Sequence, residues 1–214
     1  PIPWFEPFHQ KGIKCIPVVP NVKLSQRVQA HGADALVVEG MEAGGHDGKL
    51  TLMALLENVL PDIEIPVIAA GGITDGRGIA ASLLMGASGV QMGTRFLLAE
   101  ECSLHPKAKD AIMAAADTDS VVTGFTTGDS VRGLKNRFSD RYLKAEYSGA
   151  SPDELSSISA GTTKRGALFG DTENGFILAG MSLTHLTKIQ SAKEIVEELV
   201  SETERRLAAA PGLI

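Results

Sequence analysis

Four short apolar segments, separated by helical patterns, most constrain the fold of this chain. They are IKCIPVV at residues 13–19, ALVV at 35–38, IEIPVIAA at 63–70 and GVQMGT at 89–94. Each is nearly continuous rather than alternating, which indicates strands buried on both faces of a parallel sheet. Helical patterns at residues 22–31, 50–59 and 79–85 lie between them. Residues 13–100 therefore predict four βα units and an α/β fold.

The pattern changes after residue 100. Residues 105–116 are expected to be helical, whereas residues 117–175 are rich in Gly, Ser, Thr and Asp, show no clear βα unit and predict a small lid subdomain. Residues 191–209 give the clearest helix, because Ser191 followed by Glu194 forms a capping-box pattern and Ile195, Leu199 and Leu207 help form one apolar stripe. The expected segments are 1–104 for the barrel portion, 105–190 for the lid and 191–214 for the C-terminal helix.

Composition excludes several classes of protein. The 214 residues carry a formal net charge of -6, with 43% hydrophobic and 21% charged residues, so no basic surface for nucleic acid or anionic membrane is expected. No apolar run approaches the roughly 18 residues that cross a bilayer, and no signal peptide is evident. The two cysteines, Cys15 and Cys102, are not in metal-ligand spacing. We therefore expect a cytoplasmic protein without a metal site.

A glycine-rich loop with a histidine follows the second expected strand. It reads Glu39-Gly40-Met41-Glu42-Ala43-Gly44-Gly45-His46. Gly44 and Gly45 would allow a flat ligand to approach closely, and His46 can carry a proton near neutral pH and supply it during a reaction. A glycine-rich turn with an incidental surface histidine is the alternative, and Glu39 and Glu42 could equally contact a ligand or face water.

Two further loops have the composition of a phosphate site. Ala69-Ala70-Gly71-Gly72-Ile73 follows the third strand, and Gln91-Met92-Gly93-Thr94 follows the fourth. Backbone N–H groups beside glycine can converge on a phosphate, and many barrels bind phosphate with loops after successive strands. The alternative is that these glycines only make tight turns.

Other patterns are weaker. Residues 76–81, GRGIAA, match the dinucleotide fingerprint G-x-G-x-x-A, but the preceding strand ends near Ala70 and no suitably placed acid follows. Cys102 is better explained as an inert thiol than as a nucleophile. Arg132, Lys135 and Arg137 form a local basic cluster that is either a solvated face or a contact for a phosphorylated substrate.

At the three loops the chain resembles the FMN-dependent enoyl-acyl-carrier-protein reductases of the FabK type, within the nitronate monooxygenase (2-nitropropane dioxygenase)-like superfamily. The matching stretches are IPVVPNV, GADALVVEGMEAGGHDG, PVIAAGGITDGRG and GASGVQMGTRFLLAEEC. EGMEAGGH, AAGGI and VQMGTRF are typical of the superfamily. The continuation GTRFLLAEEC, followed by VVTG, VRGLKN and LAGM, favours the reductase branch. The likeness extends over nearly the whole chain.

The resemblance implies a TIM (β/α)₈ barrel, here its second half with strands 5–8, and a site for FMN. The FMN phosphate would bind Gly71, Gly72, Gly93 and Thr94, with Glu39, Gly44, Gly45, Ala70 and Gln91 lining the flavin site. His46 would be the catalytic histidine. NADH or NADPH would reduce FMN, and the reduced flavin would give hydride to the β-carbon of a 2-enoyl thioester on acyl carrier protein. In the nitronate branch the matching histidine is a base.

The chain also departs from this family. Members carry about a hundred more residues before the segment that PIPWFEPF resembles, and four strands alone cannot close an eight-stranded barrel. We expect the open edge to be covered either by the N-terminal half or by a second copy in a homodimer. A half-barrel that binds flavin or phosphate without catalysis is the remaining alternative.

Overall fold

The computed structural model describes residues 1–213, which form two compact units. The first unit contains residues 1–42, 48–92 and the chain from residue 197 onward, and the second contains residues 43–47 and 93–196. The loop that carries His46 thus belongs to the second unit although the strand before it belongs to the first. The expected segments 1–104, 105–190 and 191–214 follow chain order instead, and that division stays a prediction.

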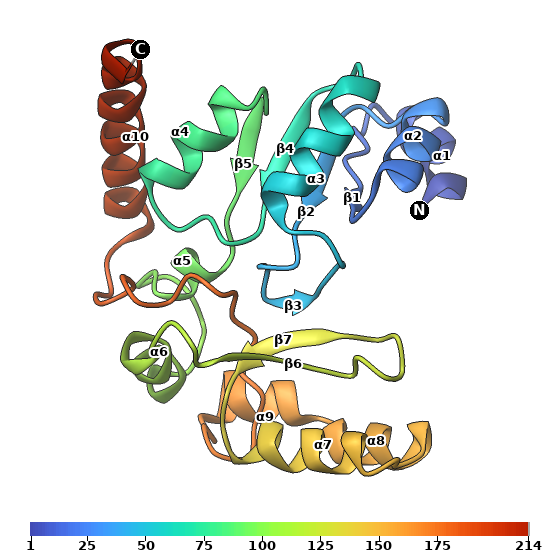
Figure 1. Ribbon diagram of the computed structural model, residues 1–214, viewed down its shortest axis with the longest axis vertical. Coiled ribbons are helices and arrows are strands. Elements are labelled where there is room, and N and C mark those ends of the chain that lie inside the picture. The colour runs from blue at the N-terminus through green and yellow to red at the C-terminus, as the bar shows by residue number, and fades with distance from the viewer. Residues whose placement is uncertain (214) are drawn as a thin grey trace. The chain divides into compact units, whose positions relative to one another are not determined.

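The first unit is built on a four-stranded parallel sheet. Its strands are β1 (Val18–Val19), β2 (Leu36–Glu39), β4 (Val67–Ala70) and β5 (Gly89–Gln91), in the order β1-β2-β4-β5 (Figure 1). Parallel neighbours need crossover connections, and α2 (Val22–Ala30), α3 (Leu52–Val59) and α4 (Gly76–Leu84) supply them. The predicted α/β fold with four βα units is confirmed.

The first strand is shorter than the sequence predicts. Of residues 13–19, only Val18 and Val19 pair with β2. Pro17 has no N–H to donate to a ladder, so its contribution is limited to its carbonyl, which accepts a hydrogen bond from Val37 N at 3.0 Å. The expectation of a seven-residue strand was therefore wrong.

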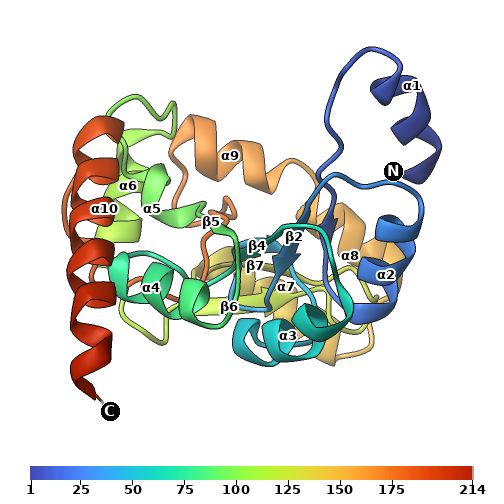
Figure 2. The ribbon, with the colours of Figure 1, turned by 90° about the horizontal axis from the view of Figure 1, so that it is seen from above.

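The helices of this unit bury their apolar stripes against the sheet. In α3, Leu55, Leu56 and Val59 are at most 1% exposed and join a core with Val38 and Val67. Figure 2 shows α3 beside β2 and β4, which it contacts. The Asn21 side chain caps α2 by accepting a hydrogen bond from Leu24 N at 2.9 Å. The short helices η1 (Ile2–Trp4), α1 (Phe5–His9) and η2 (Leu60–Asp62) complete the unit.

The second unit contains an antiparallel sheet that the sequence did not predict. The strands β3 (Gly45–His46), β7 (Val131–Leu134) and β6 (Ser120–Thr123) lie in the order β3-β7-β6. The expected absence of a βα unit in residues 117–175 is confirmed, because a hairpin and three helices occupy that stretch. These are α7 (Arg137–Tyr147), α8 (Pro152–Ser159) and α9 (Thr162–Phe169). The helices α5 (Thr94–Leu97) and α6 (Pro106–Ala114) precede the hairpin.

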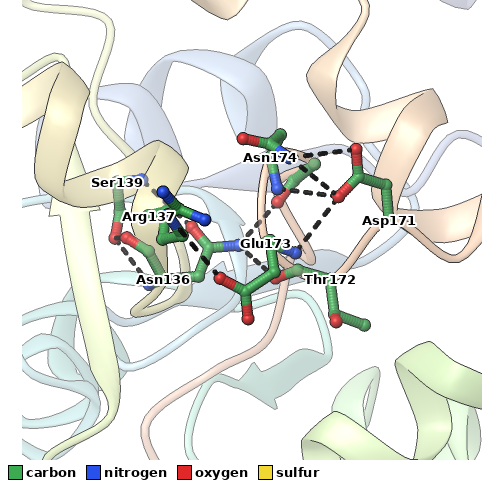
Figure 3. Close-up of polar contacts among 8 residues, drawn as sticks. Asn136, Arg137, Ser139, Asp171, Thr172, Glu173 and Asn174 are labelled. Carbon is green, nitrogen blue, oxygen red and sulfur yellow. Dashed lines mark hydrogen bonds and ion pairs between the residues drawn. The ribbon is translucent and has the colours of Figure 1, made fainter.

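Asn136 fixes the loop that leads out of α9. Its side chain caps α7 by accepting a hydrogen bond from Ser139 N, and its amide donates to the carbonyls of Thr172 and Gly175 at 2.8 and 2.7 Å (Figure 3). Asp171 accepts a hydrogen bond from Asn174 N at 2.9 Å within the same loop. One polar side chain thus holds residues 171–175, so that Phe176 can bury its ring against Phe138.

The last long helix is α10 (Ala192–Ala209), followed by η3 (Ala210–Leu213). Its predicted capping box is confirmed, since Ser191 N donates to Glu194 Oε2 at 2.9 Å and Glu194 N donates to Ser191 Oγ at 3.2 Å. Of its apolar stripe, Ile195 and Leu199 are buried and Leu207 is half-buried. Within residues 1–213, none of the helices is long and apolar enough to cross a membrane.

Candidate functional site

The carboxyl edge of the parallel sheet brings together five of the predicted site residues. Glu39 ends β2 opposite Ala70, and Ala70 ends β4 opposite Gln91, the last residue of β5. Gly71 and Gly72 follow Ala70 with φ of 105° and 69°, in the left-handed region that side chains rarely adopt. Active-site residues of parallel barrels lie at this edge, so the first unit presents its predicted flavin-lining set in one row.

The two glycine-rich turns of the second unit meet a common segment. Gly44 packs so closely that a Cβ there would lie 2.5 Å from the carbonyl carbon of Ala179. The neighbouring Gly180 donates its N–H to Thr94 Oγ1 at 2.9 Å. Ala179 and Gly180 therefore connect the histidine loop to the start of α5. The sequence singled out LAGM only for its resemblance and gave Ala179 and Gly180 no role at the site.

Gly93 and Gly45 are glycines for different reasons. A Cβ at Gly93 would meet no atom within 4 Å among residues 1–213, so packing does not require glycine there, and the turn stays open on that side. Gly45 adopts a φ of 93°, which favours glycine at the start of β3. Gly44, by contrast, is required by internal packing against Ala179, and its expected contact with a flat ligand stays a prediction.

His46 is held on the edge of the antiparallel sheet with its side chain exposed. It pairs with Val131 across β3 and β7, and its Nε2 lies 3.2 Å from Asp129 Oδ1. Both side chains are about three-quarters exposed, at 77% and 76%. A carboxylate at this distance can orient the imidazole. Exposed pairs of this kind also occur on ordinary protein surfaces, so the catalytic role of His46 stays a prediction beside the incidental surface histidine.

The residue that follows His46 in the chain, Asp47, forms a buried ion pair with Arg132. Asp47 Oδ2 is 3.6 Å from Arg132 Nη2, and the two side chains are 3% and 5% exposed. Arg132 also donates to Ser120 Oγ at 3.2 Å, and Asp47 N donates to Ser130 O at 3.3 Å. Asp47 Oδ1 is buried without a hydrogen-bond partner in the described part of the chain. The pair was missed because nothing local in the sequence links residues 85 positions apart.

The basic cluster expected from the sequence does not form one surface. Arg132 is buried in the pair with Asp47, whereas Arg137 is exposed and lies 4.0 Å from Glu173 (Figure 3). Lys135 is exposed on the loop between β7 and α7. The three cations lie in different environments because Arg132 is on β7, Lys135 is on the following loop and Arg137 begins α7. A contact with a phosphorylated substrate gains no support here.

Two other acids and the fingerprint glycines have structural roles. Both carboxylate oxygens of Glu42 accept a hydrogen bond from Leu52 N, at 3.0 and 2.9 Å, which caps α3. The Asp75 side chain accepts from Arg77 N and Gly78 N and so occupies the N-terminus of α4. Gly76 lies against Glu202 and Thr203, where a Cβ would clash at 2.6 Å. The match to the dinucleotide fingerprint is therefore a capped helix start and a close helix contact.

The predicted site residues fall into two groups. Glu39, Ala70, Gly71, Gly72 and Gln91 belong to the first unit, and Gly44, Gly45, His46, Gly93 and Thr94 belong to the second. Each group is assembled within its own unit by strand pairing or by direct contact. That the two groups share one ligand stays a prediction. Cys102 is a free, half-buried thiol, and no catalytic partner for it was found among the described contacts.

Parallel strands ending in glycine-rich turns, with a histidine on an adjoining loop, define a class of α/β proteins that bind ligands at the carboxyl ends of their strands. The chain belongs to the nitronate monooxygenase family, whose family model matches residues 5–202. The resemblance inferred from the loop motifs is thereby confirmed.

Relatives and solved structures agree with this family. A probable nitronate monooxygenase of Staphylococcus aureus strain MSSA476 is 34% identical over 90% of this chain. FabK from Thermotoga maritima superposes with a TM-score of 0.96 at 37% identity, covering all of this chain and 68% of that one. A nitroalkane oxidase from Streptomyces ansochromogenes gives 0.84 at 29% identity, covering 98% of this chain and 62% of that one. These neighbours confirm the predicted barrel-type α/β class.

The chain spans 57% of the length of the Staphylococcus aureus relative. The expectation that it corresponds to only part of a family member therefore agrees with the comparison. Which segment or subunit completes the fold stays a prediction.

Proposed function

We propose that this chain is part of an FMN-dependent oxidoreductase that reduces 2-enoyl thioesters carried by acyl carrier protein, with NADH or NADPH as reductant. The observation that carries the proposal is His46, exposed beside Asp129, on a chain whose backbone is so similar to that of FabK. The higher identity to FabK than to the nitroalkane oxidase, 37% against 29%, favours reduction over nitronate oxidation.

The residues present fit a bound FMN. Gly71 and Gly72 adopt left-handed conformations that turn backbone N–H groups at the carboxyl edge, and Gly93 leaves room beside the start of α5. Gly71, Gly72, Gly93 and Thr94 would hold the phosphate, and Glu39, Gly44, Gly45, Ala70 and Gln91 would line the ring system. When bound, FMN supplies the hydride chemistry that protein side chains lack.

His46 would act as the proton donor or hydrogen-bond donor in this reaction. In its protonated form, the imidazole oriented by Asp129 would donate a hydrogen bond to the enolate oxygen that develops as the β-carbon is reduced, or supply the proton to the α-carbon. Both roles require an exposed ring nitrogen, and the 77% exposure of the side chain leaves the imidazole accessible.

A nitronate monooxygenase is the second candidate, because the curated relatives carry that name. In that reaction His46 would remove a proton from the substrate. Anaerobic mixing separates the two activities. Rapid bleaching of protein-bound FMN by NADH or NADPH supports the reductase, whereas bleaching only by an alkyl nitronate supports the oxygenase. A colourless chain that does not bind added FMN would contradict both activities for this chain alone and favour a fragment that awaits its partner.

His46→Ala tests the role of the histidine. We expect FMN binding to be kept, because the phosphate contacts lie elsewhere, and turnover of a 2-enoyl thioester to fall by about 10²- to 10⁴-fold, the usual contribution of a positioned acid or base. His31→Ala is the matched control, since His31 is exposed at the end of α2 and its Nδ1 lies 2.7 Å from the carbonyl oxygen of Arg27. Unchanged turnover in the His46 variant would remove this residue from the mechanism.

A further inference from the structure

Three different donor side chains converge at the N-terminal end of the first unit, away from the carboxyl edge of the sheet. His9 ends α1, Cys15 precedes β1, and Asp34 lies in the loop between α2 and β2. One donor atom from each lies within 4.8 Å of the other two. The sequence predicts no metal ligands, because its two cysteines are far apart, and the fold assembles this group from residues that have no motif spacing.

Asp34 organises the cluster. Its Oδ2 accepts a hydrogen bond from Cys15 N at 2.8 Å and lies 2.9 Å from His9 Nε2, and its Oδ1 accepts from Lys14 Nζ at 2.7 Å. These three contacts fix the carboxylate between His9 and the segment that precedes β1.

The burial of the three side chains suits a metal site that opens to solvent on one side. Cys15 is 6% exposed, whereas the side chains of His9 and Asp34 are 33% and 21% exposed. Because the imidazole and the carboxylate are accessible and the thiol is buried, an ion that enters from solvent would bind His9 and Asp34 before Cys15. Zinc ligands lie at about 2.0–2.3 Å, so modest side-chain rotations would bring the three donors onto one ion.

We propose that His9, Cys15 and Asp34 form a three-ligand site for a divalent transition metal of the zinc type, with water as the fourth ligand. Thiolate and imidazole donors favour zinc, cobalt or nickel over magnesium and calcium, which prefer oxygen ligands. Lys14 opposes binding, because its ammonium group neutralises Asp34 and repels a cation. Metal binding replaces the contact between His9 and Asp34 by a shared ion and releases the thiol proton of Cys15.

Titration of the metal-free chain with Co²⁺ tests the proposal directly. A thiolate ligand gives a sulfur-to-cobalt charge-transfer band, and tetrahedral coordination gives intense visible bands. We expect both bands to reach their full intensity at one equivalent of Co²⁺. Zn²⁺ should displace Co²⁺ and remove both bands, whereas Mg²⁺ should not. Absence of a charge-transfer band in the folded wild-type chain would overturn the proposal.

Matched variants assign the ligands. Cys15→Ser should abolish the charge-transfer band, and His9→Gln, at a partly exposed position, should weaken Co²⁺ binding by more than about 100-fold, since even outer-shell partners are worth 10- to 100-fold. Cys102→Ser and His31→Ala should leave binding unchanged. Lys14→Met should tighten it, an effect that a merely structural cluster would not produce. Retention of the band in His9→Gln with unchanged affinity, or its loss in Cys102→Ser, would also contradict the site.

Discussion

The two units position their predicted site residues by different physical means. In the first unit the backbone positions the site residues. Strand register places Glu39, Ala70 and Gln91 side by side, and glycines in left-handed conformations turn the chain directly after β4. In the second unit side-chain contacts dominate, because His46 depends on a neighbouring carboxylate and on a buried ion pair in the same sheet. The site residues of the first unit, which we call the backbone-built group, should therefore tolerate changes of neighbouring side chains. The site residues of the second unit, the side-chain-built group, should not.

The largest difference should appear at the buried ion pair of the second unit. Asp47→Ala removes the carboxylate that faces a buried guanidinium, and breaking such a pair costs about 3–5 kcal/mol in the free energy of unfolding. Denaturant unfolding measures this loss. The double variant Asp47→Ala/Arg132→Met should recover much of the stability, because no uncompensated charge is left.

The exposed pair nearby is the control for that comparison. Asp129→Asn should change the free energy of unfolding by no more than about 1 kcal/mol, because both partners are largely exposed to solvent. An equal loss in the Asp47 and Asp129 variants would show that burial does not set the strength of these contacts.

Gly44 should be the next most sensitive position. Gly44→Ala forces a methyl group against the backbone of Ala179 and Gly180, and overpacking of this kind costs about 1–3 kcal/mol. The melting temperature of this variant is compared with that of Gly93→Ala, where a Cβ meets no described neighbour within 4 Å. The difference between the two melting temperatures measures the steric effect. Similar melting temperatures for the two variants would contradict the packing role of Gly44.

The backbone-built group of the first unit should respond to a change in conformational freedom. Gly71→Ala places a side chain at a φ of 105°, which we expect to cost about 1–2 kcal/mol and to weaken FMN binding. Fluorescence titration with FMN and denaturant unfolding measure the two effects. Gly89→Ala, at a position with open space in the same sheet, should leave FMN affinity unchanged.

A smaller effect than at the glycines is expected at the cap of α4, and it should depend on pH. Partial burial raises the pKa of Asp75, but hydrogen bonds from Arg77 and from the Gly78 N–H lower it by more, so the net pKa lies below its usual value. The resulting stabilisation is present above pH about 4, the ordinary carboxyl range, and is lost as pH falls through the lowered pKa of the folded state.

Asp75→Ala should therefore cost about 0.5–2 kcal/mol at neutral pH, the value of a helix N-cap. The difference from the wild type should shrink as the solution is acidified, which unfolding curves at several pH values would detect. A difference that grows in acid would reverse the sign assigned to this carboxylate.

The sequence predicted the first unit better than the second, for physical reasons. Buried parallel strands and their connecting helices leave a local pattern of apolar residues, so β2, α2 and α3 were located to within about two residues, and the end of β4 was placed correctly although its start was predicted four residues too early. The row of site residues at the carboxyl edge followed from that topology. Pro17 weakened the strand prediction for residues 13–19. The sequence alone did not show that only Val18 and Val19 would pair with β2.

The second unit depends on contacts between residues that are distant in the chain. The strands of the β6–β7 hairpin read SVVT and VRGL, which are not the continuous apolar runs that marked the strands of the first unit, and β3 has only two residues. The pairing of Asp47 with Arg132, and of His46 with Asp129, is a tertiary event that local composition does not encode. Glu42 was ambiguous for the same reason, since only the fold shows that it caps α3.

The segment formed by Ala179 and Gly180 has a consequence for how this protein could be engineered. It touches Gly44 on one side and donates to Thr94 on the other, so it acts as a spacer that sets the separation of two turns at once. A bulkier residue at position 179 should therefore move the imidazole-bearing strand and the threonine turn in concert. Specificity could be retuned from this single point while both turns keep their own sequences.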